Sequence, residues 1–141
     1  MNLARFSLGA TSFAFFFFGC WLLVQPDGLA GVGIFLPTET ARIEIRSMYG
    51  GFEIGLGIFF LLSVMRPSWH RPALMLQAIS LASLGFTRLV TTIIADNPNP
   101  VMYWFCALEL MAAAIGSFAY RRMGTYRRAS DRNATSVPPA S

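Results

Sequence analysis

The sequence contains no lysine, one histidine and two cysteines, and each scarcity excludes a kind of site. Because His70 is the only histidine, neither a histidine-based catalytic triad nor a multi-histidine metal site can be built. Cys20 and Cys106 fit no CxxC or zinc spacing, so we interpret both as packing residues. The segment Gly31-x-Gly33 lacks a third glycine and a lysine, which excludes a phosphate-binding loop. We therefore expect no metal and no cofactor.

The sequence also lacks the patterns of two large protein classes. Its net charge is +4, but no aromatic residues alternate with the arginines, and five arginines follow the last apolar stretch, at positions 121–132. Arginines in that place meet anionic lipid headgroups, so we expect no nucleic-acid partner. The serine and threonine residues form no recognisable nucleophile–base pattern, so nucleophilic catalysis has no support. A non-enzymatic role is favoured, and enzymatic activity is left open.

The sequence is rich in hydrophobic residues, which make up 55% of its 141 residues. Four apolar stretches cover residues 6–24, 47–65, 72–95 and 101–120. About 20 apolar residues cross roughly 30 Å of hydrocarbon, so each stretch can span a bilayer. Short, proline-containing connections force consecutive helices to run antiparallel. We predict an all-α membrane protein, an up-down bundle of four transmembrane helices in residues 1–123, and a disordered Arg-rich cytoplasmic tail in residues 124–141.

The placement of charge predicts the orientation of the bundle. Arg5, Arg66 and Arg71 fall on the same side of a four-span bundle as the arginines at positions 121–132. Basic residues mark the cytoplasmic face, so we expect both termini to be cytoplasmic. A basic set without lysine is typical of GC-rich bacterial genomes, so we expect a multi-pass protein of the bacterial inner membrane. The first stretch exceeds the 7–15 apolar residues of a signal peptide, so we expect it to be retained.

The link after the first stretch is rich in glycine. We expect residues 28–37 to lie along the outer interface as a short re-entrant or amphipathic segment. Thr38 or Thr40 can then cap the second helix, which begins outside the membrane and continues inward.

Three charged residues, Glu53, Arg88 and Glu109, lie inside the predicted spans. A charge there costs roughly 2.5–3.5 kcal/mol, so it needs a partner or a purpose. At 1.5 Å per residue, all three lie roughly 10–13 Å below the outer boundary. On the second helix, Arg46 and Tyr49 share the face of Glu53 at three- and four-residue spacing. We predict that Arg88 bridges the two glutamates, with Arg46 and Tyr49 closing the outer side.

This cluster has two main interpretations. The first is a structural ion-pair network that fixes helix register in an accessory or scaffold subunit. The second is a buried polar pocket in the outer half of the membrane, which binds or passes a small polar ligand, a lipid headgroup or a proton. An intramembrane enzyme that acts on a lipid or a quinone is a third hypothesis.

Gly51 and Gly55 form a small-xxx-small pair that is displaced from the charged face. Such a pair lets another helix approach closely. We expect the first helix of the same chain to pack there, with a homo-oligomer or a partner membrane protein as the alternative.

The segment Glu44-x-Arg46-x-x-Tyr49-Gly50-Gly51 runs directly into a Gly-rich helix, and Arg88 and Glu109 follow on later helices. These features resemble the domain of unknown function family numbered 4345, a family of small four-helix inner-membrane proteins. The turn after Asp96 departs from the family pattern, because Asn97 stands where a glycine is expected. The resemblance implies the four-span fold from the first helix to Tyr120, and it implies no activity.

Overall fold

The computed structural model describes residues 2–135, with side-chain surroundings for residues 3–124. The described chain is helical along most of its length. Its α-helices are α1 (Asn2–Val24), α2 (Glu39–Ile45), α3 (Phe52–Met65), α4 (His70–Ile94) and α5 (Val101–Thr135). Three shorter elements connect them: the 3-10 helices η1 (Pro26–Val32) and η3 (Pro67–Trp69), and the π-helix η2 (Arg46–Gly51).

Four segments are long and apolar enough to cross a membrane. They are Leu3–Val24, Glu39–Met65, Pro67–Ile94 and Val101–Gly124. Each covers nearly all or all of one of the four predicted stretches, so the prediction of an all-α chain with four apolar helices is confirmed. Many large apolar side chains, among them Phe6, Phe13 and Ile93, are exposed on the outside of these helices. Such a surface fits contact with a lipid bilayer rather than with water.

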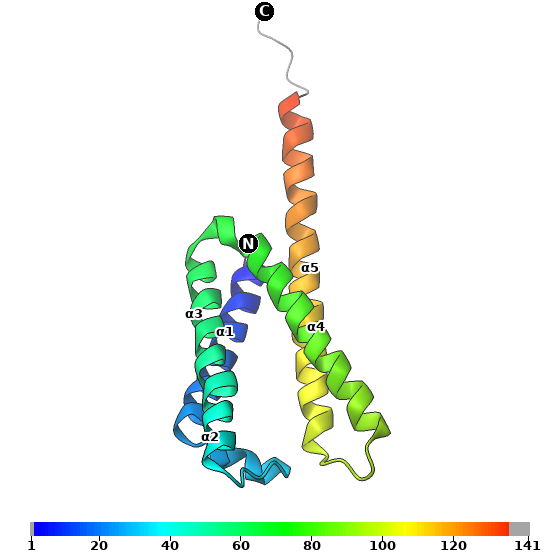
Figure 1. Cartoon of the computed structure of the whole chain (residues 1–141). Helices are drawn as coiled ribbons and strands as arrows, with labels where there is room; N and C mark the ends of the chain where they lie inside the picture. Colours follow the sequence, from blue (N-terminus) through cyan, green and yellow to red (C-terminus); the bar gives the residue numbers. More distant parts are fainter. Residues whose placement is uncertain (1, 136–141) are drawn as a thin grey trace, which may run out of the picture.

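The helices form two closely packed pairs, α1 with α3 and α4 with α5. In Figure 1 the two pairs meet at the end that holds the N-terminus and diverge toward the other end. We call the first end the corner end, because η3 turns the chain from α3 into α4 there. We call the second end the loop end, because it holds η1 and the link between α4 and α5.

The apolar core lies at the corner end, where all four spans contribute side chains. Its buried members are Ala4, Leu8, Phe60, Ala73, Leu74 and Ala119. Phe60 of α3 is fully buried and stacks on Phe15 of α1, with ring centroids 5.9 Å apart. On α4, Arg71 donates a hydrogen bond to the Tyr120 hydroxyl of α5 (3.3 Å), a contact within the second pair. The shared apolar core fixes the two pairs to each other at the corner end.

A buried polar contact joins three helices next to this core. The Gln77 side-chain amide of α4 donates to the Ser7 hydroxyl of α1 (2.9 Å) and to the Ala112 carbonyl of α5 (3.1 Å). Gln77 and Ser7 are almost fully buried. A Cβ atom on Gly116 would lie 3.2 Å from the Gln77 amide, so glycine at this position leaves room for the amide between α4 and α5. This contact satisfies polar groups that would otherwise be costly inside hydrocarbon.

The α1–α3 pair packs through glycines other than the two that we predicted. A Cβ atom on Gly19 would lie 2.9 Å from the Ile54 nitrogen, and one on Gly57 would lie 3.2 Å from the Phe16 nitrogen. Gly50 is equally close to Leu23. The expectation that α1 packs on Gly51 and Gly55 is therefore wrong. A Cβ atom on Gly55 would meet nothing within 4 Å, and one on Gly51 would meet only the Arg46 carbonyl, at 3.9 Å.

The loop end begins as predicted and then differs in detail. Thr38 caps α2, because its hydroxyl accepts a hydrogen bond from the Ala41 backbone N–H (3.1 Å). The preceding segment folds as the single 3-10 helix η1, which ends at Gly33 in the left-handed conformation (φ 92°). A glycine takes that conformation without steric cost.

The last element also differs from the expected tail. α5 continues as a helix to Thr135, so the backbone of residues 124–135 is not the disordered segment that the polar composition predicted. Arginine and alanine are good helix formers and extend the preceding span with no proline to stop it. The rest of the expected tail, residues 136–141, lies outside the described residues.

Candidate functional site

The strongest polar contact at the loop end is an ion pair between Arg88 of α4 and Glu109 of α5. The Arg88 Nε donates to both carboxylate oxygens of Glu109 (3.2 and 3.0 Å), and Nη2 donates to Oε1 (2.8 Å). The side chains are only 27% and 14% exposed. Gly85, one turn before Arg88, makes the approach of the two helices possible, since a Cβ there would lie 3.1 Å from the Glu109 Cβ. The fork of a guanidinium fits a carboxylate in this two-point manner.

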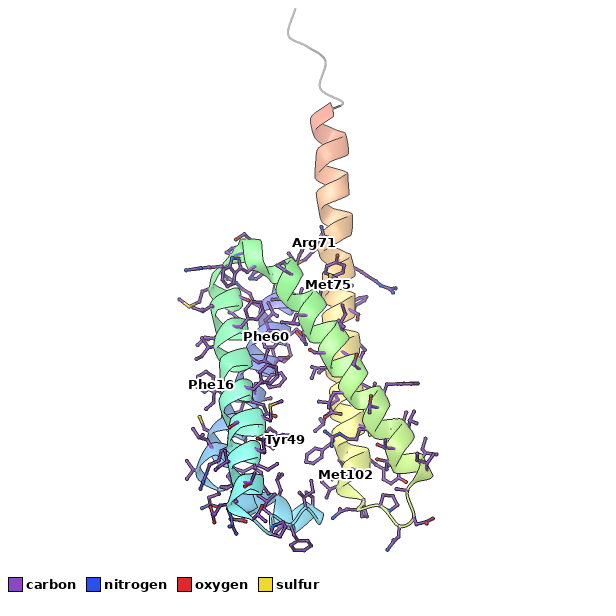
Figure 2. All side chains as sticks on the ribbon, in the orientation of Figure 1. Phe16, Tyr49, Phe60, Arg71, Met75 and Met102 are labelled. Atoms are coloured by element: carbon purple, nitrogen blue, oxygen red, sulfur yellow. The ribbon has the colours of Figure 1, made fainter. Side chains whose placement is uncertain are left out.

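The Arg88 guanidinium also faces a thioether sulfur and an aromatic ring. Its Nη1 atom lies 3.8 Å from the Met102 sulfur, and its Cζ lies 5.5 Å from the centre of the Phe105 ring. Tyr49 belongs to η2, on the other helix pair, and is half exposed. Figure 2 places Tyr49 on the α2–α3 side and Met102 on α5, both at the loop end. Phe105 in turn packs against Phe18 of α1 (6.4 Å between ring centroids).

Glu53 lies on the inward face of α3, between two of the glycines that pack on α1. Gly50, Gly57 and Phe60 are all buried and mark that face, and each follows or precedes its neighbour in the series 50, 53, 57 and 60 by three or four residues. The Oε2 atom of Glu53 is buried and makes no hydrogen bond within the described part of the chain. Arg88 directs its charge to Glu109, so the prediction that it bridges both glutamates is wrong for Glu53.

The π-helix η2 explains why Arg46 and Glu53 do not share one face of the second helix, as predicted. Residues 46–51 follow a wider turn, in which the Phe52 backbone N–H donates to the Ser47 carbonyl five residues earlier. One extra residue in the turn rotates everything before it by about 100° relative to everything after it. Arg46 is therefore turned away from Glu53, and its Nε donates to the Leu23 carbonyl at the end of α1 (3.2 Å). Arg46 closes the end of α1 and not the charged cluster.

A second charged group lies nearer the loops. Arg42 of α2 forms ion pairs with Asp27 of η1 (3.1 Å) and with Glu39, one turn earlier on α2. Both carboxylates are well exposed, at 59% and 78% of the side chain. This group ties η1 to the start of α2 and is separate from the buried pair.

Several polar residues are buried that the sequence analysis did not single out as buried, among them Ser7, Ser12 and His70. Ser7 and Ser12 lie on one face of α1, and the Ser12 hydroxyl donates to the Gly57 carbonyl (2.8 Å). Their signal was the recurrence of small polar residues on one side of an apolar stretch. His70 is 1% exposed, and its Nε2 atom lies 3.4 Å from the Val64 carbonyl oxygen. No spacing in the sequence distinguishes a buried corner histidine from an exposed one.

The four-span region matches one known family. Comparison with curated proteins and with solved structures gave no match. A family described as a domain of unknown function (DUF4345) matches residues 3–120, a region that contains the 44–51 motif together with Arg88 and Glu109. The resemblance drawn from those residues is confirmed, and this protein belongs to the DUF4345 family.

Proposed function

We propose that this protein is a multi-pass protein of the bacterial inner membrane, with the corner end and both termini on the cytoplasmic side. The support is the distribution of charge. Eight of the eleven arginines belong to the corner end or to the α5 extension, whereas six of the seven acidic residues belong to the loop end. Cytoplasmic flanks carry the excess of basic residues, so the loop end faces outward.

We further propose that the loop end holds a polar binding site built from Tyr49, Glu53, Arg88 and Glu109. The observation that carries this proposal is the buried Oε2 atom of Glu53, which has no partner in the described chain. An ionised carboxylate without a partner is costly inside hydrocarbon, so the site favours a proton or the donor group of a bound molecule. The Arg88 pair supports the proposal, because the Met102 sulfur is the only hydrogen-bond acceptor of the Arg88 Nη1 atom among the described residues, so this atom can also donate to a ligand.

The experiment compares wild type, Glu53→Gln and the matched control Glu44→Gln, which removes an exposed carboxylate from α2. Each protein is extracted with native lipids and analysed by mass spectrometry for a co-purifying molecule. Infrared difference spectra between acid and alkaline buffer detect the protonated carboxyl group of Glu53. We expect the wild type and Glu44→Gln to share a bound molecule or a carboxyl band that Glu53→Gln loses. Identical spectra and no bound molecule in all three proteins contradict the proposal.

A second candidate is an accessory or scaffold subunit whose buried charges only hold the helices in register. The observation in its favour is that Arg88, Arg42 and Arg46 each have a partner within the chain. In this candidate the buried Glu53 carboxylate destabilises the fold and binds nothing. Glu53→Gln should therefore raise the free energy of unfolding and change no binding. The same three proteins therefore separate the two functions.

A further inference from the structure

We propose that the corner end binds an anionic phospholipid, whose phosphate is held by Arg71 where α4 meets α5. This site lies at the opposite end of the bundle from the polar site proposed above and does not depend on it. Three observations carry it: the charge of the corner end, the surroundings of the Arg71 guanidinium, and the depth of that group in the membrane.

The corner end carries basic charge without acidic charge. Among residues 3–124, five arginines belong to this end, whereas all six carboxylates belong to the loop end. A ring attracts the guanidinium charge from one side, but it accepts none of the N–H groups in the guanidinium plane, which remain for an anion. Three of the five guanidinium groups lie over aromatic rings, 4.6–5.0 Å from the ring centres: Arg66 over Trp69, Arg71 over Tyr120 and Arg122 over Phe118.

The Arg71 guanidinium is held against α5 at this end (Figure 2). Its Nη2 atom donates to the Tyr120 hydroxyl (3.3 Å), and its Cζ lies 4.9 Å from the centre of the Tyr120 ring. Its Nε atom is buried and has no hydrogen-bond partner within the described chain. The neutral Tyr120 hydroxyl is thus the only acceptor that residues 3–124 offer to Arg71. A half-buried cation with a neutral acceptor alone favours an anion that accepts its remaining N–H groups.

The neighbouring turn of α5 leaves room beside this guanidinium. Position 124 is a glycine, and a Cβ atom there would lie 3.7 Å from the Arg71 Nη2 atom. A side chain longer than that of alanine would therefore compete for the space at that nitrogen. Arg71 also lies in the first turn of α4, where the helix dipole favours an anion and disfavours a cation. An anion bound at this point offsets both the charge of Arg71 and the dipole.

The depth of the site favours a lipid over a soluble anion. The span Val101–Gly124 ends at this level, and the span Pro67–Ile94 begins four residues before Arg71. Four residues of helix rise about 6 Å, so the long Arg71 side chain reaches the lipid phosphates at the membrane interface. The described part of the corner end has no carboxylate to receive an ammonium or choline group. The ligand is therefore a phospholipid whose headgroup has a net negative charge.

The test compares two lipids with the same acyl chains, phosphatidylglycerol and phosphatidylcholine. The full-length protein in detergent is titrated with each, and native mass spectrometry measures the fraction of protein that retains a lipid molecule. We expect phosphatidylglycerol to bind at least about tenfold more tightly, and Arg71→Gln to remove that advantage, because charged hydrogen bonds to the phosphate are lost. The control Arg5→Gln removes an exposed charge from the same end and should change binding by less than about threefold.

A second variant keeps every arginine. Gly124→Leu places a side chain against the Arg71 Nη2 atom and should also weaken the binding of phosphatidylglycerol, while leucine preserves the helix. If Arg71→Gln proves unfolded by circular dichroism or size-exclusion chromatography, Gly124→Leu decides the inference, and unchanged binding in that variant overturns it.

Three other results contradict the proposal. Equal binding of the two lipids, or unchanged phosphatidylglycerol binding in folded Arg71→Gln, overturns the site. A loss in Arg5→Gln as large as that in Arg71→Gln shows a general attraction by the basic end and also overturns it. Displacement of the lipid by an excess of inorganic phosphate assigns the site to a soluble anion and overturns the lipid as its ligand.

Discussion

The corner end and the loop end of this bundle differ in how their helices are packed. At the corner end, Leu8, Phe60 and Leu74 are fully buried, and all four spans meet around them. At the loop end each helix pair packs on itself, and Phe18 contacts Phe105 between the two pairs. The difference indicates that the corner end determines the fold, while the loop end is left free to carry charge.

The same contrast appears in the polar groups. The Gln77 amide at the corner end is fully paired with Ser7 and Ala112. The Glu53 carboxylate at the loop end has an oxygen without a partner. A buried polar group that is satisfied stabilises a membrane bundle, whereas an unsatisfied one requires an explanation such as a proton, a water, an ion or a ligand.

The largest expected loss of stability comes from breaking the buried ion pair at the loop end. Arg88→Gln leaves Glu109 buried without its partner, so we expect the free energy of unfolding in detergent to fall by about 3–5 kcal/mol. The double variant Arg88→Gln/Glu109→Gln removes both charges and should recover much of that loss. If the single variant unfolds no more easily than wild type, the ion pair does not hold α4 to α5.

A second prediction concerns the glycine packing of α1. In Gly19→Ala the new methyl group would lie about 3 Å from backbone atoms of Ile54 and Gly50, so we expect a loss of about 1–3 kcal/mol. The control is Gly9→Ala on the same helix, where a Cβ meets nothing within 4 Å. Its higher helix propensity should stabilise the protein by up to about 1 kcal/mol. Equal stability of the two variants contradicts the close α1–α3 approach.

A third prediction probes the polar contact at the corner end. Gln77→Met keeps the length of the side chain and removes its hydrogen bonds to Ser7 and Ala112. Interhelical hydrogen bonds in membranes are worth about 0.6–1.7 kcal/mol, which is the loss that we expect in chemical unfolding. Ser80→Ala is the control, because the Ser80 hydroxyl bonds only within α4. A loss as large as that of Arg88→Gln would make the two ends equivalent.

The smallest effect is expected from the exposed ion pairs. Arg42→Gln removes contacts to Asp27 and Glu39, whose side chains are largely exposed, so the expected loss is up to about 1 kcal/mol. Thermal unfolding at low and high salt measures it, and the difference from wild type should shrink as salt rises. A larger, salt-independent loss would show that η1 contributes to the fold.

The sequence predicted the helices well because membrane spans depend on composition over long windows. Four stretches of about 20 apolar residues were sufficient, and Thr38 followed a simple capping rule. Pairings between helices depend on phase instead. The angular position of Arg46 around the helix was predicted at 3.6 residues per turn, but residues 46–51 form the π-helix η2, which has a wider turn. The composition of this segment does not predict that wider turn.

The glycines illustrate the same limit. The small-xxx-small spacing pointed to Gly51 and Gly55, whereas α1 packs on Gly50 and Gly57, which are seven residues apart and lie on a neighbouring face. Both sets obey helical spacing, so the sequence alone could not choose between them. The choice is made by Gly19 and Phe16 on the partner helix, and their position is a property of the assembled bundle.

The uninterrupted length of α5 has a mechanical consequence. This one helix carries Glu109 near its beginning, is held at Ala112 by Gln77, and extends past the bundle to Thr135 (Figure 1). Ala119 and Tyr120 of the same helix are held at the corner end, by the apolar core and by the Arg71 side chain, so α5 is fixed at several points along the bundle. The contacts inside the bundle therefore determine the direction in which the helix continues beyond Tyr120.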